Sequence, residues 1–282
     1  MEFLQALYAN PLLFYAVLAG LLASVCSGVI GSYVVVKRVV LISGSIAHSI
    51  LGGIGLCVWL QRAHNISWAL PLYGALITGI LSALIIGWIH LYYREREDTV
   101  IAAVWSLGMA SGVIFISQTP GFNVELTSFL IGNILWVSPQ DLYLLVLLDA
   151  IVLTFVVLLH KRFLAICFDE EQAKLQGISV KFYYLLLLTL IAITIVMLIQ
   201  VVGIILVMTL LTIPAAIGNM MTSRLSRMMM AAVILCALFT FTGTATSYYL
   251  DWPSGATIAL LAGAFYLVSL LVINRSRRVS YQ

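Results

Sequence analysis

The amino-acid sequence predicts an all-α, multi-pass membrane protein. Its 282 residues are 63% hydrophobic and only 9% charged, whereas soluble domains average about 45–50% apolar and about 25% charged residues. The apolar residues form long segments, and a helix needs about 20 mostly apolar residues to cross a bilayer. Too little polar chain is left for a separate soluble domain of about 100 residues, which excludes a fused ATPase or kinase module.

Nine segments are candidate transmembrane helices. In chain order they cover residues 11–36, 39–60, 68–93, 100–117, 142–159, 182–199, 202–220, 228–249 and 255–273. The weakest boundary lies between the sixth and seventh segments, where Gln200 and Gly203 interrupt the apolar run. One long tilted helix there, giving eight in all, is the alternative.

The basic residues decide between these two topologies. With nine crossings, all of the 14 Lys and Arg residues except Arg62 fall on one side of the membrane. The positive-inside rule makes that side cytoplasmic, whereas eight crossings would put basic clusters on opposite sides. We therefore expect nine helices, with the N-terminus outside and the C-terminus in the cytoplasm.

The second segment carries one histidine, His48, about halfway along its length. On a helix this residue shares a face with Gly44, Gly52 and Gly55. Small residues on one face let another helix approach closely, or leave a hollow. An ionisable residue at such depth is a functional-site hypothesis, and neutral imidazole binds zinc, manganese or iron. A histidine hydrogen-bonded to a neighbouring helix is the alternative.

An acidic residue, Asp149, lies in the middle of the fifth segment. An ionised carboxylate at this depth costs several kcal/mol unless it is paired or hydrated. Asp149 is therefore a second candidate metal-binding residue, with a protonated carboxyl or a water-filled cleft as the alternatives.

The longest cytoplasmic connection, residues 160–181, contains a short helix with marked ends. Asp169 can cap its N-terminus, and Glu170 and Glu171 suit the positive end of the helix dipole. Gly177 can end it. About two turns of helix are unstable alone in water, so either the membrane domain or a docking partner must hold them.

Five stretches together resemble the permease subunit of ATP-driven importers for zinc, manganese or iron, the ABC-3 metal permeases. They are VVVKRVVLISGSIAHSILGGIGL, LTSFLIGNILWVSPQDL, FDEEQAKLQGISV, VVGIILVMTLLTIPAAIG and YLDWPSGATIALLAGAFYLVS. The resemblance covers about residues 11–273. The shared order and spacing of all five stretches make it far more specific than any single stretch.

The resemblance implies a type II importer fold, with residues 1–282 as a single transmembrane permease domain that is not itself an enzyme. Two copies would pair in a prokaryotic inner membrane. Two separate ATP-binding subunits would sit on the cytoplasmic face, and an extracytoplasmic solute-binding protein would deliver the ion. The divalent metal is then cargo, no permanently bound cofactor is expected, and nucleic acid is not a partner.

The resemblance also implies roles for single residues. It places His48 on the metal path and Gly132 and Asn133 in the outer lining of the path. The glycine face around His48 adds Gly44 and Gly52 as candidate lining residues. It makes residues 169–177 a coupling helix resting in a groove of the ATPase. The coupling residues would be Asp169, Glu170, Glu171, Ala173, Leu175 and Gly177. This chain has Gly44 where the family often has an aspartate four residues before the histidine, so a two-ligand site on one helix does not carry over.

Two alternative functions stay open. A permease of the same type for an iron chelate, haem or cobalamin would need a wider path, and the histidine of the second segment argues against it. A proton-coupled secondary carrier would need several buried acids in a relay, whereas Asp149 is the only firmly mid-span acid in the sequence.

Overall fold

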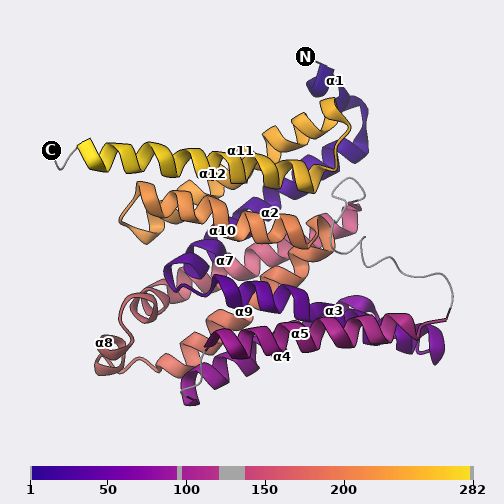
Figure 1. Ribbon diagram of the computed structural model, residues 1–282. Helices are drawn as coiled ribbons and strands as arrows, with labels where there is room; N and C mark the ends of the chain where they lie inside the picture. The colour runs from indigo at the N-terminus through magenta and orange to yellow at the C-terminus, as the bar shows by residue number, and fades with distance from the viewer. Residues whose placement is uncertain (1, 94–96, 121–136, 280–282) are drawn as a thin grey trace. The chain divides into compact units, whose positions relative to one another are not determined.

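The computed structural model describes residues 2–93, 97–120 and 137–279 (Figure 1). Its helices are α1 (Glu2–Ala9), α2 (Pro11–Val36), α3 (Val40–Ala63), α4 (Pro71–Tyr92), α5 (Glu97–Ser117), α7 (Pro139–Phe168), α8 (Glu170–Leu175), α9 (Val180–Val202), α10 (Ile204–Met221), α11 (Leu225–Leu250) and α12 (Ser254–Val279).

Nine helices in the described part of the chain are long and apolar enough to cross a membrane, namely α2 to α5, α7 and α9 to α12. This confirms the predicted all-α, multi-pass fold. The weakest predicted boundary is real: α9 ends at Val202, α10 begins at Ile204, and Gly203 between them has a φ of 82°. Glycine adopts that conformation without steric cost, so a single glycine separates the two helices.

Two elements differ from the prediction. Residues 2–9 form the short helix α1, which precedes the first predicted span. Helix α7 continues to Phe168, well beyond the predicted end at residue 159. Its extension carries Lys161 and Arg162 and contains no glycine or proline. Lysine and arginine are good helix formers, so the helix persists past the apolar segment.

The chain divides into two compact units, which we describe separately. Unit 1 consists of Met1–Val36, Leu130–Leu153 and Val201–Gln282. Unit 2 consists of Lys37–Phe129 and Thr154–Gln200. Whether residues 1–282 act as one permease domain stays a prediction.

Unit 1 is built around α2, which packs against α10 and α11, while α12 contacts both of these helices. The approach is close because glycines face the neighbouring backbones. A Cβ added at Gly31 would lie 2.1 Å from the carbonyl oxygen of Leu211 in α10. One added at Gly28 would lie 2.5 Å from the backbone nitrogen of Val233 in α11.

Unit 2 is built around α3, which packs against both α4 and α5. The tightest contact joins α3 to α4, because a Cβ added at Gly53 would lie 2.1 Å from the carbonyl oxygen of Gly74. On α4, Gly87 faces the side chains of Leu185 and Leu188 of α9. Helix α3, which carries the candidate histidine, is therefore held on at least two sides.

Candidate functional site

The imidazole of His48 lies near the middle of α3. Because an α-helix rises 1.5 Å per residue, His48 is about 12 Å along the axis from the first residue of the helix. It is half-buried and stacks on the indole of Trp105 in α5, with 4.3 Å between ring centroids and 7° between ring planes. The Trp105 Nε1 atom lies 3.0 Å from Met109 Sδ, which orients the indole. Sequence analysis did not identify Trp105, because nothing in the residues around it marks a partner for a histidine on another helix.

One nitrogen of the histidine is left without a partner. The Nδ1 atom of His48 is buried and makes no hydrogen bond with any residue that the structure describes. The alternative, a histidine hydrogen-bonded to a neighbouring helix, is not observed at Nδ1 among the described residues, and α5 contacts the ring by stacking instead. A buried nitrogen that has lost water is costly unless something binds it. This atom is the strongest candidate ligand atom in unit 2.

The glycine face of α3 is a close-packed seam against α5. A Cβ added at Gly52 would lie 2.9 Å from the carbonyl oxygen of Gly108, and one at Gly55 would lie 2.8 Å from that of Gly112. Of the two alternatives for such a face, close approach of a helix is the one observed for these two glycines. Gly44 is buried, and the predicted path lining by Gly44 and Gly52 stays a prediction.

Serine hydroxyls fix the rotation of α3 beside its histidine. Ser45 Oγ donates to the carbonyl oxygen of Ile101 in α5, at 2.9 Å. The hydroxyls of Ser49 and Ser82 are hydrogen-bonded at 2.8 Å, which joins α3 to α4. These contacts on either side of His48 hold its imidazole toward Trp105.

The mid-span acid has a partner within unit 1. Asp149 is 9% exposed, and its carboxyl is hydrogen-bonded to the thiol and the backbone of Cys26 in α2. This contact compensates part of the cost of a carboxyl at that depth. His48 belongs to unit 2 and Asp149 to unit 1, so the idea that Asp149 replaces the carboxylate absent at Gly44 stays a prediction.

No three His, Cys, Asp or Glu side chains among the described residues lie close enough together to hold a metal ion. A resident metal usually has three or four protein ligands. An ion in passage needs weaker, sequential contacts, because it must leave as readily as it enters. Gly132 and Asn133, which were also predicted to line the path, lie outside the described residues.

The predicted short cytoplasmic helix is present as α8, with both predicted end signals. Asp169 has extended backbone angles, and its Oδ1 accepts a hydrogen bond from the backbone N–H of Gln172 at 2.9 Å. At the other end Gly177 has a φ of 76°. The N–H of Ile178 donates to the carbonyl oxygen of Ala173 at 3.0 Å, as in a glycine-terminated helix.

The predicted contact residues of α8 do not all face the same way. Ala173 is 1% exposed, whereas Leu175 is 89% exposed. Ala173 therefore holds the helix to its own unit, and contacts with a partner would have to come from exposed residues such as Leu175 and Glu171. A groove of about 380 Å³ runs between α7 and α8 and is lined by Lys161, Leu164, Ala165, Phe168, Asp169, Gln172, Ala173 and Gln176.

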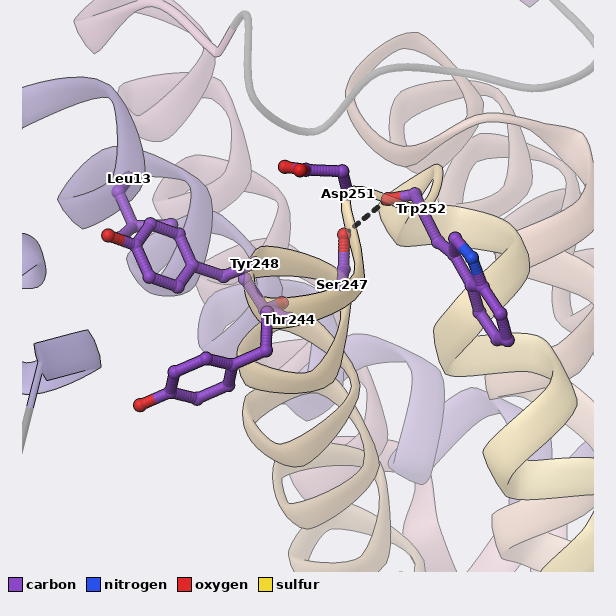
Figure 2. A pocket seen from close by; sticks show the side chains of 7 residues that line it. Leu13, Thr244, Ser247, Tyr248, Asp251 and Trp252 are labelled. Atoms are coloured by element: carbon purple, nitrogen blue, oxygen red, sulfur yellow. Dashed lines mark hydrogen bonds between the residues drawn. The ribbon is translucent and has the colours of Figure 1, made fainter.

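Unit 1 contains a hollow of about 500 Å³ where α11 ends and α2 begins (Figure 2). Ser247 Oγ donates to the carbonyl oxygen of Trp252 at 2.6 Å, and Asp251 has a left-handed φ of 52°. Asp251 supplies the one carboxylate among the lining residues of this hollow. Its lining is Leu13, Thr244, Ser247, Tyr248, Tyr249, Asp251 and Trp252.

Comparisons with known proteins agree over almost the whole chain. The model of the ABC 3 transport family matches residues 9–273. A Chlamydia pneumoniae protein named "Probable metal transport system membrane protein" is 54% identical over 258 residues, covering 92% of this chain and 88% of its own. The manganese transport system membrane protein MntC of Listeria monocytogenes is 32% identical over 271 residues, covering 96% of this chain and 94% of its own.

A solved structure shows the same fold. The match is to PsaBC from Streptococcus pneumoniae in complex with Fab, with a TM-score of 0.82 and 28% sequence identity. It covers 95% of this chain and 94% of the matched chain. The likeness therefore extends over nearly the whole chain.

Proposed function

Because the chain belongs to the ABC 3 transport family, we propose that it is the membrane-spanning subunit of an ATP-driven importer of divalent metal ions. The family match over residues 9–273 carries this proposal. The names of the relatives, one for metal transport and one for manganese transport, support the cargo class. The half-buried His48, whose Nδ1 has no partner among the described residues, supplies a nitrogen suited to such an ion.

The metal path in this proposal includes His48. Stacking on Trp105 fixes the plane of the imidazole, so Nδ1 is oriented before the ion arrives. A single imidazole binds a divalent ion far more weakly than a four-ligand cage does, which suits passage. Asp149 is proposed as a second path residue, whose carboxyl would exchange its hydrogen bond with Cys26 for the ion.

Two copies of the chain would form the path by alternating access, in a prokaryotic inner membrane. Energy would come from two separate ATP-binding subunits, and a solute-binding protein would deliver the ion from outside. The distribution of basic residues supports an N-terminus outside and a C-terminus in the cytoplasm. Helix α8 then lies on the cytoplasmic side, where ATP-binding subunits would dock.

The exposed side chains of α8 support docking to an ATP-binding subunit. It presents the apolar side chain of Leu175, which is 89% exposed, and the exposed carboxylate of Glu171. Its cap at Asp169 and its left-handed end at Gly177 hold these side chains in a fixed helix. Burying an exposed leucine contributes about 1.5–3 kcal/mol, which favours a protein partner over water at this position.

The proposal favours manganese, iron or zinc over a metal chelate, haem or cobalamin, because a histidine on a packed helix suits a bare ion. The proton-coupled carrier is disfavoured, since the mid-span acid Asp149 is hydrogen-bonded to a thiol, which is no proton relay. Among the three metals, imidazole suits zinc and iron, whereas carboxylate and water suit manganese.

Deleting Glu170–Gln176 tests the proposal. The chain should still insert in the membrane, but it should no longer co-purify with its ATP-binding subunit. Cells lacking the chain should also hold less of one divalent metal, measured by mass spectrometry. Unaltered co-purification would remove the coupling role of α8, and a loss of haem or chelate uptake with normal metal content would favour the alternative cargo.

A further inference from the structure

Lys37 joins the short helix α8 to the start of the histidine-bearing helix α3. Its Nζ atom lies 2.5 Å from Glu170 Oε1, on the first residue of α8, and donates to the carbonyl oxygen of Ile166 near the end of α7 at 2.9 Å. We propose that Lys37 is the positioning residue that transmits movement of α8 to α3. This inference rests on the proposed function and extends it to a residue that the sequence marks only as a cytoplasmic charge.

The contact is well enclosed. The side chain of Lys37 is 13% exposed and that of Glu170 is 31% exposed. The ammonium group also lies 5.4 Å from the centre of the Tyr184 ring of α9, within cation–π range. Three elements of unit 2, the ends of α7, α8 and α9, thus meet at one ammonium group. An enclosed ion pair is screened less by water and salt than an exposed one. The attraction between Lys37 and Glu170 is therefore weakened less than that of a surface pair.

The connection from Lys37 to α3 is short. Helix α3 begins at Val40, and the N–H of Ser43 in its first turn already donates to the carbonyl oxygen of Val39 at 3.1 Å. Between Lys37 and Val39, Arg38 has a φ of 62°, a conformation that bulky residues rarely adopt. A chain spans at most about 3.5 Å per residue, so a link of this length cannot absorb a large displacement.

The ion pair also changes the role expected for Glu170. Its carboxylate is directed at Lys37, so contact with an ATP-binding subunit is left to the more exposed residues of α8, such as Leu175. When a docked subunit moves α8, either the Lys37–Glu170 contact breaks or the start of α3 follows. In the second case the movement reaches His48, eight residues after Val40 on the same helix.

The test separates transport from ATP hydrolysis. The complete complex of permease, ATP-binding subunit and solute-binding protein is reconstituted in vesicles, with manganese as the probe. Manganese uptake and ATP hydrolysis are measured in the same vesicles for the wild type, Lys37→Met and Lys37→Arg. The matched control is Lys181→Met, since the Lys181 ammonium lies 4.0 Å from the centre of the Tyr92 ring and takes no part in the Lys37–Glu170 contact.

Lys37→Met is expected to lower manganese uptake per ATP hydrolysed by about tenfold, within the ~5–150-fold range of couplings between distant sites. Lys37→Arg, which can still bond the carboxylate and the carbonyl, should restore most of the ratio. Lys181→Met should match the wild type. A merely structural lysine would lower uptake and hydrolysis together and leave the ratio unchanged, which would overturn the proposal.

If Lys37→Met does not assemble, Glu170→Gln tests the same contact from the α8 side. The amide keeps the shape of the side chain and removes its charge, so uptake per ATP should fall while the subunits still co-purify. A wild-type ratio in Glu170→Gln would overturn the role of the ion pair. The failure of the proposed function itself is distinguishable, because the wild-type complex would then show no ATP-driven manganese uptake.

Discussion

The imidazole of His48 lies flat against the indole of Trp105, with 4.3 Å between the ring centroids. The two residues come from α3 and α5, helices whose backbones approach closely at paired glycines. Stacking fixes the plane of the imidazole without using a hydrogen bond, and Nδ1 has no partner among the described residues. The arrangement therefore fixes the orientation of the nitrogen that we propose as a metal ligand.

Replacing His48 by alanine should lower metal uptake while the ATP-binding subunit still docks. Loss of one contact worth about 1.4 kcal/mol corresponds to a tenfold loss in binding, so we expect a decrease of about tenfold or more. Metal uptake by vesicles measures the expected decrease, and co-purification of the ATP-binding subunit measures whether docking is retained. The matched control is His64→Ala at the exposed end of α3, and wild-type uptake in the His48 variant would remove this residue from the path.

Replacing Asp149 by asparagine tests the second proposed path residue. An amide can keep a hydrogen bond with Cys26 but carries no charge for a divalent ion, so we expect lower metal uptake with an unchanged yield of folded protein. Uptake kinetics measure metal transport, and size-exclusion chromatography measures the yield of folded protein. Asp251→Asn, at the exposed end of α11, is the control. Normal uptake would leave Asp149 as a structural acid held by Cys26.

Replacing Gly53 by alanine should destabilise unit 2. The added Cβ would lie 2.1 Å from the carbonyl oxygen of Gly74, and forcing atoms into a packed core costs about 1–3 kcal/mol. The measurement is the apparent melting temperature in detergent. Gly263→Ala is the matched control, because a Cβ there meets nothing within 4 Å, and it should be neutral or slightly stabilising. Equal melting temperatures would contradict the close packing of α3 and α4.

Much of the fold could be predicted from local sequence patterns. Apolar segments of sufficient length predict the nine helices of the described residues that are long and apolar enough to cross a membrane. The charge asymmetry favours separating α9 from α10, and the two helices are separate at Gly203. The end signals of α8 were also readable, because Asp169 and Gly177 act on residues within one turn of themselves. Features that depend on nearby residues are therefore accessible to sequence analysis.

The contacts of the candidate site could not be predicted in the same way. Lys37 and Glu170 are 133 residues apart in the chain, and no local pattern joins them. The same holds for the partners of His48 and Asp149, which are Trp105 and Cys26. Such pairs form only when helices pack, and the apolar residues that drive packing do not specify which polar groups will meet.

The cap of α8 provides a matched pair of substitutions. Asp169→Ala removes the acceptor of the Gln172 N–H, and loss of an N-cap costs about 1 kcal/mol. Helix α8 has only six residues, so we expect the loss of its cap to weaken the docking of the ATP-binding subunit. Since every 1.4 kcal/mol is a tenfold change in affinity, about 1 kcal/mol corresponds to roughly fivefold weaker association. Asp169→Ser keeps an acceptor and should bind nearly as well as the wild type. Equal weakening by both variants would instead assign the effect to the lost charge. The measurement is a titration of the purified subunit onto the permease.

The most direct test of the proposed importer is ATP-driven manganese uptake by vesicles that contain the chain, its ATP-binding subunit and its solute-binding protein. We expect manganese to accumulate with ATP, to stop accumulating with an analogue that cannot be hydrolysed, and to accumulate far less in the His48→Ala complex. Uptake driven by a proton gradient without ATP, or no uptake of any divalent metal by the assembled complex, would contradict the proposed function.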